Sequence, residues 1–284
     1  MKKILSLVTA AVLLLSFGGC TKKNTTAGDT TNKNEVSSGT ETGKSDDKKE
    51  IIVGATPVPH KEILEIVKPI LEKEGYTLTI KEFTDYVLPN TELNEGSLDA
   101  NFFQHVPYLE ATNAEKGTDL TYTVKVHLEP MGLYSKKIKS LDELKDGATI
   151  SIPNDSTNGA RALRLLEKNG IIKLKDGELV TKLDIIENPK NIKIEELEAP
   201  MLPTTLADVD ASIINSNFAM ENGLNPTTDS IVIEDKESPY ANVLAVKRGN
   251  EDKPYIQALS KALTSEEVKK FIEEKYEGAI VPSF

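Results

Sequence analysis

Cysteine is almost absent from this chain, since its 284 residues include a single one, Cys20. No disulfide can therefore form within the chain, and a buried core must supply the stability of the fold. The stretch from Ile51 to Phe284 is long enough to build such a core.

Sequence motifs of catalysis and of metal binding are also missing. The chain has no glycine-rich phosphate loop with a following Lys-Ser/Thr, no Gly-x-Ser-x-Gly elbow and no His-Glu-x-x-His. The three histidines, His60, His105 and His127, lie far apart and lack the spacing of metal ligands. With 45 Asp and Glu residues, spacing alone identifies no acid-base couple. We therefore expect no enzyme, no metal and no cofactor.

Positive charge is in deficit, because 34 Lys and Arg face 45 Asp and Glu and the formal net charge is -11. An acidic chain repels the phosphate backbone of nucleic acids. Its lysines mostly alternate with acidic residues, as on solvated faces, so we expect no nucleic-acid partner. Attraction to anionic lipids is excluded for the same reason, and attachment to a membrane would rest on acyl chains.

The first residues are typical of a bacterial export signal. Lys2 and Lys3 precede an apolar run, Ile4–Phe17, which is followed by Gly18-Gly19 and then by Cys20. The apolar run is short for a membrane span. A lone thiol at the cleavage position is best explained as the residue that is acylated, for example with palmitate, and becomes the new N-terminus.

We therefore predict a lipoprotein signal peptide at 1–19 and a lipid anchor on Cys20. The anchor would hold the protein on the extracytoplasmic face of the cell membrane, and acylation would exclude catalysis by this thiol. Two alternatives stay open: an ordinary secretory signal with an incidental cysteine, and a single-pass anchor. Phe17 departs from the leucine that lipoprotein signals usually carry three residues before the cysteine.

Residues 20–50 comprise the anchor position and a segment with almost no large apolar side chain. Thr, Ser, Gly, Asn, Asp and Lys dominate it, so it cannot bury enough surface to offset the entropy lost on ordering. We interpret it as a flexible linker.

From Ile51 onward, short apolar strands alternate with amphipathic helices, which predicts an α/β fold with largely parallel sheets. Strands are expected at Ile51–Ala55, Thr77–Phe83, Asp99–Phe103, Thr121–Val126, Gly132–Tyr134, Thr149–Ile152, Ala211–Ile214, Ile231–Ile233 and Val243–Lys247. Helices are expected at Lys61–Glu74, after a capping box that begins at Ser140, and at Arg161–Asn169, Pro254–Leu263 and Glu266–Glu274.

An internal similarity suggests two lobes. Leu98–Phe102 and Val209–Ile213 each turn from a short helix into a strand, although so short a match could also arise by chance. Both segments would deliver side chains at the carboxyl ends of parallel strands, where open α/β sheets bind ligands. Two such lobes facing one another would form a cleft.

Aromatic residues gather at one predicted strand end. Alternation along the strand places Phe103 and His105 on one side, with Tyr108 one turn later. Tyr86 follows another strand end and could complete the same pocket wall. For Phe102, core packing and a place in the pocket are equally acceptable interpretations.

Arg161 is the second candidate. It follows a loop of cap-forming residues, 153–160, that enters a predicted helix, and helix N-termini favour anions. An arginine in the first turn of a helix opposes the helix dipole, so we interpret it as a functional residue that binds a carboxylate. The alternative is a surface arginine, a description that suits Arg164 on the same helix better.

Asparagines form the third group. Asn215 ends one predicted strand and Asn242 begins another, and their amide oxygens could accept hydrogen bonds from an ammonium group. For the neighbouring Ser216 and Asn217, we prefer helix capping as the explanation.

Together with several matched segments, these residues resemble the NlpA/MetQ family, the methionine-binding lipoproteins of ABC importers. The resemblance covers Ile51–Phe284 and rests on segments found in the family's order: Asp85–Asn90, Asp99–Asn101 with Phe103–His105, Tyr134–Leu141, Pro153–Asp155, Glu187–Asn191 and Glu234–Tyr240. Six matches in order are far more specific than any one of them.

The resemblance implies a periplasmic-binding-protein fold, type II-like, with two α/β lobes and a ligand cleft between them. Lobe 1 would comprise 51–134 and 241–284, and lobe 2 would comprise 135–240. Carried over by position, the ligand-binding residues would be Arg161 and Asn158 at a carboxylate, Asn215 and Asn242 at an amine, and Tyr86, Phe103, His105 and Tyr108 around a thioether.

The implied function is capture of L-methionine and its delivery to a membrane permease that works with an ATPase. The protein would be a monomer whose lobes hinge near Tyr134–Lys136 and Pro239–Asn242, and no bond would be made or broken. Alternatives within binding are a methionine-containing dipeptide such as Gly-Met, D-methionine, or another apolar amino acid. An amino-acid hydrolase or racemase, and a surface adhesin, are the more distant alternatives.

Overall fold

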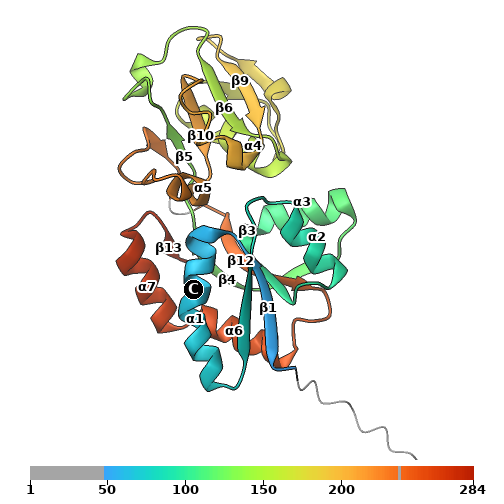
Figure 1. Cartoon of the computed structure of the whole chain (residues 1–284). Helices are drawn as coiled ribbons and strands as arrows, with labels where there is room; N and C mark the ends of the chain where they lie inside the picture. Colours follow the sequence, from blue (N-terminus) through green and yellow to red (C-terminus); the bar gives the residue numbers. More distant parts are fainter. Residues whose placement is uncertain (1–47, 236–237) are drawn as a thin grey trace, which may run out of the picture. The chain divides into compact units, whose positions relative to one another are not determined.

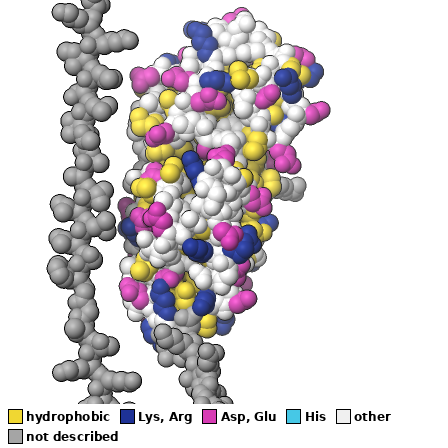
Figure 2. Space-filling view, turned by 90° about the vertical axis from the view of Figure 1, so that its right-hand side faces the viewer, with side chains coloured by type: hydrophobic (Ala, Val, Ile, Leu, Met, Phe, Trp, Pro, Cys, Tyr) yellow, Lys and Arg dark blue, Asp and Glu magenta, His cyan; other side chains and the backbone are white. Residues whose placement is uncertain are grey.

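The structure, a computed structural model, describes residues 48–235 and 238–284. The predicted signal peptide at 1–19, Cys20 and most of the predicted linker lie outside the described residues. Within the described part, no helix is both long and apolar enough to cross a membrane. On the face drawn in Figure 2, basic and acidic side chains are interspersed.

The first sheet contains six described strands in the order β13-β4-β12-β3-β1-β2. Its strands are β1 (Glu50–Ala55), β2 (Thr77–Glu82), β3 (Ala100–His105), β4 (Leu120–Leu128), β12 (Ala241–Lys247) and β13 (Val281–Pro282). β1 pairs in parallel with both β2 and β3, whereas β12, β4 and β13 are joined by antiparallel pairings. The expected parallel arrangement therefore holds for only half of this sheet.

Helices cover both faces of the first sheet (Figure 1). They are α1 (Glu62–Lys73), which follows a short π-helical segment η1 (Pro57–Lys61), and α2 (Leu88–Glu95), α3 (Val106–Lys116), α6 (Pro254–Leu263) and α7 (Glu266–Tyr276). β1 shows why two cores form, because successive side chains of a strand point to opposite faces. Val53 packs with α1, α6 and α7, whereas Ile52 packs against the cluster that contains Leu93 of α2 and Leu109 of α3.

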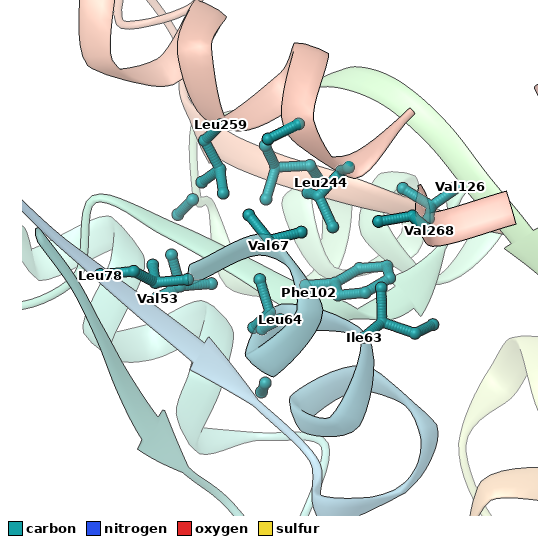
Figure 3. Packing of buried hydrophobic residues seen from close by; sticks show 14 of the residues in the cluster. Val53, Ile63, Leu64, Val67, Leu78, Phe102, Val126, Leu244, Leu259 and Val268 are labelled. Atoms are coloured by element: carbon teal, nitrogen blue, oxygen red, sulfur yellow. The ribbon is translucent and has the colours of Figure 1, made fainter. Parts of the chain in front are cut away.

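In the larger of these cores, the buried residues of α1 have the spacing expected of an amphipathic helix. Ile63, Leu64 and Val67 of α1 are fully buried, and Figure 3 shows them against Phe102 and Leu244 of the sheet. Phe102 therefore belongs to the core, and of the two interpretations left open for it, packing is the correct one.

The second sheet contains five described strands in the order β11-β5-β10-β6-β9. They are β5 (Gly132–Tyr134), β6 (Thr149–Pro153), β9 (Lys193–Leu197), β10 (Ala211–Ile214) and β11 (Val232–Ile233). β10, β6 and β9 run parallel, whereas β5 and β11 are antiparallel additions. Around it lie α4 (Ser156–Lys168), α5 (Ser216–Glu221), the hairpin β7 (Lys173–Leu174) and β8 (Ile185–Glu187), and short 3-10 helices η2 (Leu141–Glu143), η3 (Lys182–Asp184) and η4 (Ala199–Met201).

The chain passes between the two sheets twice. The first crossing, residues 129–131, joins β4 to β5, and the second joins β11 to β12, with residues 234–235 and 238–240 as its described part. Because β5 pairs with β10 and β11, Gly132–Tyr134 belongs to the second sheet. The predicted boundary after Tyr134, which assigned this strand to the first lobe, lies one strand too late.

Two local predictions near helix starts are wrong. α4 begins at Ser156, because the Asp155 side chain caps it by accepting a hydrogen bond of 2.8 Å from the backbone nitrogen of Asn158. Arg161 therefore lies in the second turn of α4, where the helix dipole does not oppose its charge as it would in the first turn. The short helix after Ser140 exists, but this serine makes no side-chain capping hydrogen bond.

Candidate functional site

A pocket beside the two crossings brings together all eight predicted ligand-binding residues: Tyr86, Phe103, His105, Tyr108, Asn158, Arg161, Asn215 and Asn242. Its lining also includes Gln104, Glu129, Ser216 and Asn217, of which Gln104 and Glu129 were not singled out from the sequence. Including its opening to solvent, the hollow contains ≈ 330 Å³ of space free of atoms.

The end of β3 places the first group of side chains. His105 is the last residue of β3 and the N-cap of α3, where its Nδ1 accepts a hydrogen bond of 3.1 Å from the backbone nitrogen of Tyr108. Phe103 and His105 both line the pocket, as the alternation along the strand predicts. Tyr108 follows one turn into α3, so a strand end and a helix start together position three of the residues.

Aromatic rings form one wall of the pocket. The ring centroid of Tyr86 lies 5.8 Å from the centroids of both Phe103 and Tyr108. On its other side, Tyr86 lies 4.9 Å from the ring of Phe218 in α5. Burial raises the pKa of both Tyr86 and Tyr108, so each phenol is neutral near pH 7 and can donate a hydrogen bond. The wall is therefore apolar except for the hydroxyl groups of Tyr86 and Tyr108.

Hydrogen bonds connect residues on the two sides of the pocket. Nε2 of His105 lies 3.1 Å from Oδ1 of Asn158, which also accepts a hydrogen bond of 3.0 Å from Nδ2 of Asn215. The Tyr86 hydroxyl donates to Oδ1 of Asn217 at 2.6 Å. His105 and Tyr86 come from segments around the first sheet, whereas the three asparagines follow strands of the second. The pocket is thus built from both sheets.

Arg161 is buried and is not a surface residue. Its Nε donates to Oε1 of Glu234 at 2.8 Å, and its Nη2 donates to the other oxygen of the same carboxylate. Nη2 also donates to the backbone carbonyl of Glu129 at 2.7 Å, and the guanidinium lies 4.2 Å from the ring centroid of Tyr240. Arg164 is the more exposed arginine of this helix, as expected.

These contacts make Arg161 a link between the two crossings. Glu129 begins the first crossing, and Glu234 and Tyr240 delimit the second. The Glu234 carboxylate also accepts a hydrogen bond of 2.9 Å from the backbone nitrogen of Met131. One guanidinium and one carboxylate therefore hold both crossing segments against α4.

The residues after β10 do not behave as helix caps. The Ser216 hydroxyl donates to the backbone carbonyl of Pro130, and Oδ1 of Asn217 accepts from Tyr86, so the capping interpretation of both residues is wrong. Asn215 occupies the N-cap of α5 without a side-chain capping bond. Among the described residues, neither Oδ1 of Asn215 nor Nδ2 of Asn217 has a hydrogen-bond partner, although both atoms are buried. The pocket lining thus holds an unused acceptor and an unused donor.

A second buried cluster adjoins the pocket. Nε2 of His127 lies 2.7 Å and Nε2 of His60 lies 3.2 Å from the same carboxylate oxygen, Oε1 of Glu129. Nδ1 of His60 lies 2.7 Å from the Thr56 hydroxyl, and its Nε2 lies 3.1 Å from Oδ1 of Asn242. Of the described residues, these two histidines and Glu129 are the group whose ligand atoms could reach a common metal ion. Folding brings together His60 and His127, which are far apart in the sequence and lack the spacing of metal ligands.

Burial determines the protonation of these groups. It lowers the pKa of His60 to about 4 and the pKa of both His105 and His127 to about 3. All three histidines are therefore neutral near pH 7. Burial also raises the pKa of the Glu129 carboxyl, although His60 and Arg161 counteract this effect.

Comparison with known proteins agrees with this architecture. A nutrient binding protein from Burkholderia cenocepacia bound to methionine superposes with a TM-score of 0.81 at 45% identity, over 82% of this chain and 100% of that chain. An ABC transporter, periplasmic substrate-binding protein from Coxiella burnetii gives 0.80 at 41% identity, over 82% and 100% of the two chains. The predicted fold, a type II-like periplasmic binding protein with two α/β lobes, is confirmed.

The family follows from the sequence comparison. The model described as NlpA lipoprotein matches residues 51–284, and the chain belongs to this family. Its relatives include the D-methionine-binding lipoprotein MetQ of Salmonella typhi, 44% identical over 81% of this chain and 86% of that protein. The methionine-binding lipoprotein MetQ of Bacillus subtilis is 44% identical over 86% and 92% of the two chains.

The buried histidines predict a loss of stability in mild acid. In the unfolded chain a histidine binds a proton near pH 6.5, whereas His60, His105 and His127 bind one in the folded protein only at about pH 3 to 4. Below pH 6.5 the unfolded state therefore binds more protons, and the free energy of unfolding falls as the pH falls. Between pH 7 and pH 5 each histidine contributes a loss of about 2 kcal/mol.

Urea unfolding of the ligand-free protein at pH 7 and pH 5 measures this loss. Glu129 acts in the opposite direction, because its raised pKa lets the folded protein take up a proton first. A His127→Gln variant should show a smaller difference between the two pH values. Equal free energies of unfolding for the wild type at both pH values would contradict neutral, buried histidines.

Proposed function

We propose that this protein is the substrate-binding lipoprotein of an ABC importer, which captures L-methionine in the pocket beside the crossings and delivers it to a membrane permease and its ATPase. The observation that carries the proposal is the pocket itself. An aromatic wall and a guanidinium face one small space, in a chain whose relatives are named for methionine.

The chemistry of the pocket suits an amino acid with a thioether. Sulfur against the rings of Tyr86, Phe103 and Tyr108 contributes about 0.3 to 1.5 kcal/mol per contact. The α-carboxylate is assigned to Arg161, with Asn158 beside it, because a buried carboxylate needs a charged partner. Asn215 and Asn242 are assigned to the amine, and the unused Oδ1 of Asn215 supports this role.

Binding and release require movement but no covalent step. In the proposed cycle the two lobes close around the ligand by hinging at the two crossings, whose described residues are 129–131, 234–235 and 238–240. The first hinge expected from the sequence, Tyr134–Lys136, begins inside β5, so we place it at the crossing before this strand. The closed, monomeric protein then docks on the permease.

Attachment to the membrane completes the proposal. We assign an acyl anchor to Cys20, on the extracytoplasmic face, with the segment up to residue 50 as a flexible linker. A receptor tethered in this way stays at high effective concentration near its permease.

Removal of the anchor tests the proposed location. A Cys20→Ala variant, expressed in a bacterial host, should leave the membrane fraction and appear in the soluble extracytoplasmic fraction or the medium, because no acyl chain retains it. Immunoblots of fractionated cells measure the distribution against the wild type. A variant that still sediments with membranes would contradict the acyl anchor.

Loss of the guanidinium tests the binding site. Arg161→Ala should weaken binding of L-methionine by about 2 kcal/mol or more, roughly 30-fold, because the ligand carboxylate loses its charged partner. Arg164→Ala on the same helix is the matched control, because Arg164 contacts Glu167 and backbone carbonyls outside the pocket. Calorimetry showing equal effects of the two variants would reject the assignment.

D-methionine is the second candidate ligand, because the Salmonella relative carries that name. Titration of the wild type with L-methionine, D-methionine and Gly-Met under the same conditions decides between the three.

A further inference from the structure

We propose that Glu129 is the anionic partner of the ligand's ammonium group and that it selects ligands with a free, protonated amine. This inference rests on the proposed function. The asparagine amides offer the ligand's ammonium group only neutral acceptors, and Glu129 would supply the negative charge.

Glu129 is buried, with 6% of its surface exposed, and it lines the pocket. Its Oε1 lies within hydrogen-bond distance of Nε2 of both His60 and His127, at 3.2 and 2.7 Å. The backbone N–H of Asn217 also donates to this carboxylate. Neutral N–H groups therefore surround Glu129 and orient it in the pocket lining.

Among the described residues, no neighbour places a full positive charge at hydrogen-bond distance from the Glu129 carboxylate. Burial raises the pKa of this carboxyl, whereas Arg161 attracts the carboxylate from farther away, which lowers that pKa. The two histidines are neutral near pH 7, because burial lowers the pKa of each. Arg161 directs its Nε and Nη2 to the Glu234 carboxylate, and it bonds to Glu129 through the backbone carbonyl. A buried carboxylate without a cation at hydrogen-bond distance is costly, and a ligand that brings a cation removes this cost.

The lining of the pocket offers acceptors for an ammonium group. An ammonium has three N–H donors, and three acceptors of the right kind line the pocket. They are the Glu129 carboxylate, Oδ1 of Asn242 and Oδ1 of Asn215, the last of which is buried without a partner among the described residues. Asn242 is coupled to the carboxylate through His60, whose Nε2 lies 3.1 Å from Oδ1 of Asn242.

A metal ion is the competing occupant, because two imidazoles and a carboxylate are also common metal ligands. Nε2 of His60 lies beside two acceptor oxygens, Oε1 of Glu129 and Oδ1 of Asn242. Such a position calls for a proton on Nε2, and a protonated nitrogen cannot bind a metal. Nδ1 of His127 has no hydrogen-bond partner among the described residues, whereas a metal-bound histidine usually donates its second N–H.

Calorimetry with two ligands tests the role of Glu129. The probes are L-methionine and 4-(methylthio)butanoate, which keeps the thioether and the carboxylate but lacks the amine. Wild-type protein should prefer methionine strongly. Glu129→Gln should weaken methionine binding about 30-fold or more and change binding of the desamino compound less than about 3-fold, so the preference collapses. Glu198→Gln, an exposed carboxylate outside the pocket, is the matched control and should keep the preference.

The outcomes separate this inference from the proposed function. If the wild type binds no methionine, the proposed function fails. If the wild type binds methionine and Glu129→Gln binds it equally well, or loses both ligands equally, the role of Glu129 is wrong. A wild type that does not prefer methionine over the desamino compound also overturns it, and this measurement does not depend on the variant folding. Methionine binding that disappears with EDTA and returns with zinc would overturn it in favour of a metal.

Discussion

The buried ion pair between Arg161 and Glu234 is the interaction on which the arrangement of the site depends. It connects α4 to both crossings between the sheets, because the guanidinium also binds the carbonyl of Glu129 and the carboxylate also binds the backbone of Met131. A guanidinium is stable in such a place only when it is paired and hydrogen-bonded. In the cycle that we propose, the segments that hinge are the segments that this pair holds together, so we expect ligand binding at Arg161 and movement of the lobes to be coupled through the same atoms.

The second constraint is the separation of charge within the pocket. Arg161 lies on α4, whereas Glu129 lies at the start of the first crossing between two neutral histidines. A cationic group and an anionic group in one buried space are complementary to a zwitterion, whose two charges must both find partners. The rings of Tyr86, Phe103 and Tyr108 form an aromatic wall, and this part of the pocket suits an apolar side chain.

The elements that the sequence predicts well are those with a strong local period. The buried face of α1 and the strand β1 follow from apolar spacing, and the side chains at the end of β3 reach the pocket because alternation places them there. α2 was expected only as a short helix before Leu98, without bounds, and α3 was missed, although Pro89 and Pro107 stand in the first turns of these helices, where proline is favoured. Glu129 and its two histidines could not be found from spacing, because only the pairing of β4 with β12 and the position of η1 bring them together. β5 was assigned to the wrong lobe, because the sequence of a three-residue strand does not indicate which sheet the strand joins.

A crystal structure of the protein with L-methionine tests the central claim most directly. We expect density for methionine in the pocket, with its carboxylate at Arg161, its thioether among Tyr86, Phe103 and Tyr108, and its ammonium within hydrogen-bond distance of Glu129. Methionine bound elsewhere, or bound in this pocket with its carboxylate directed at Glu129, would contradict the account.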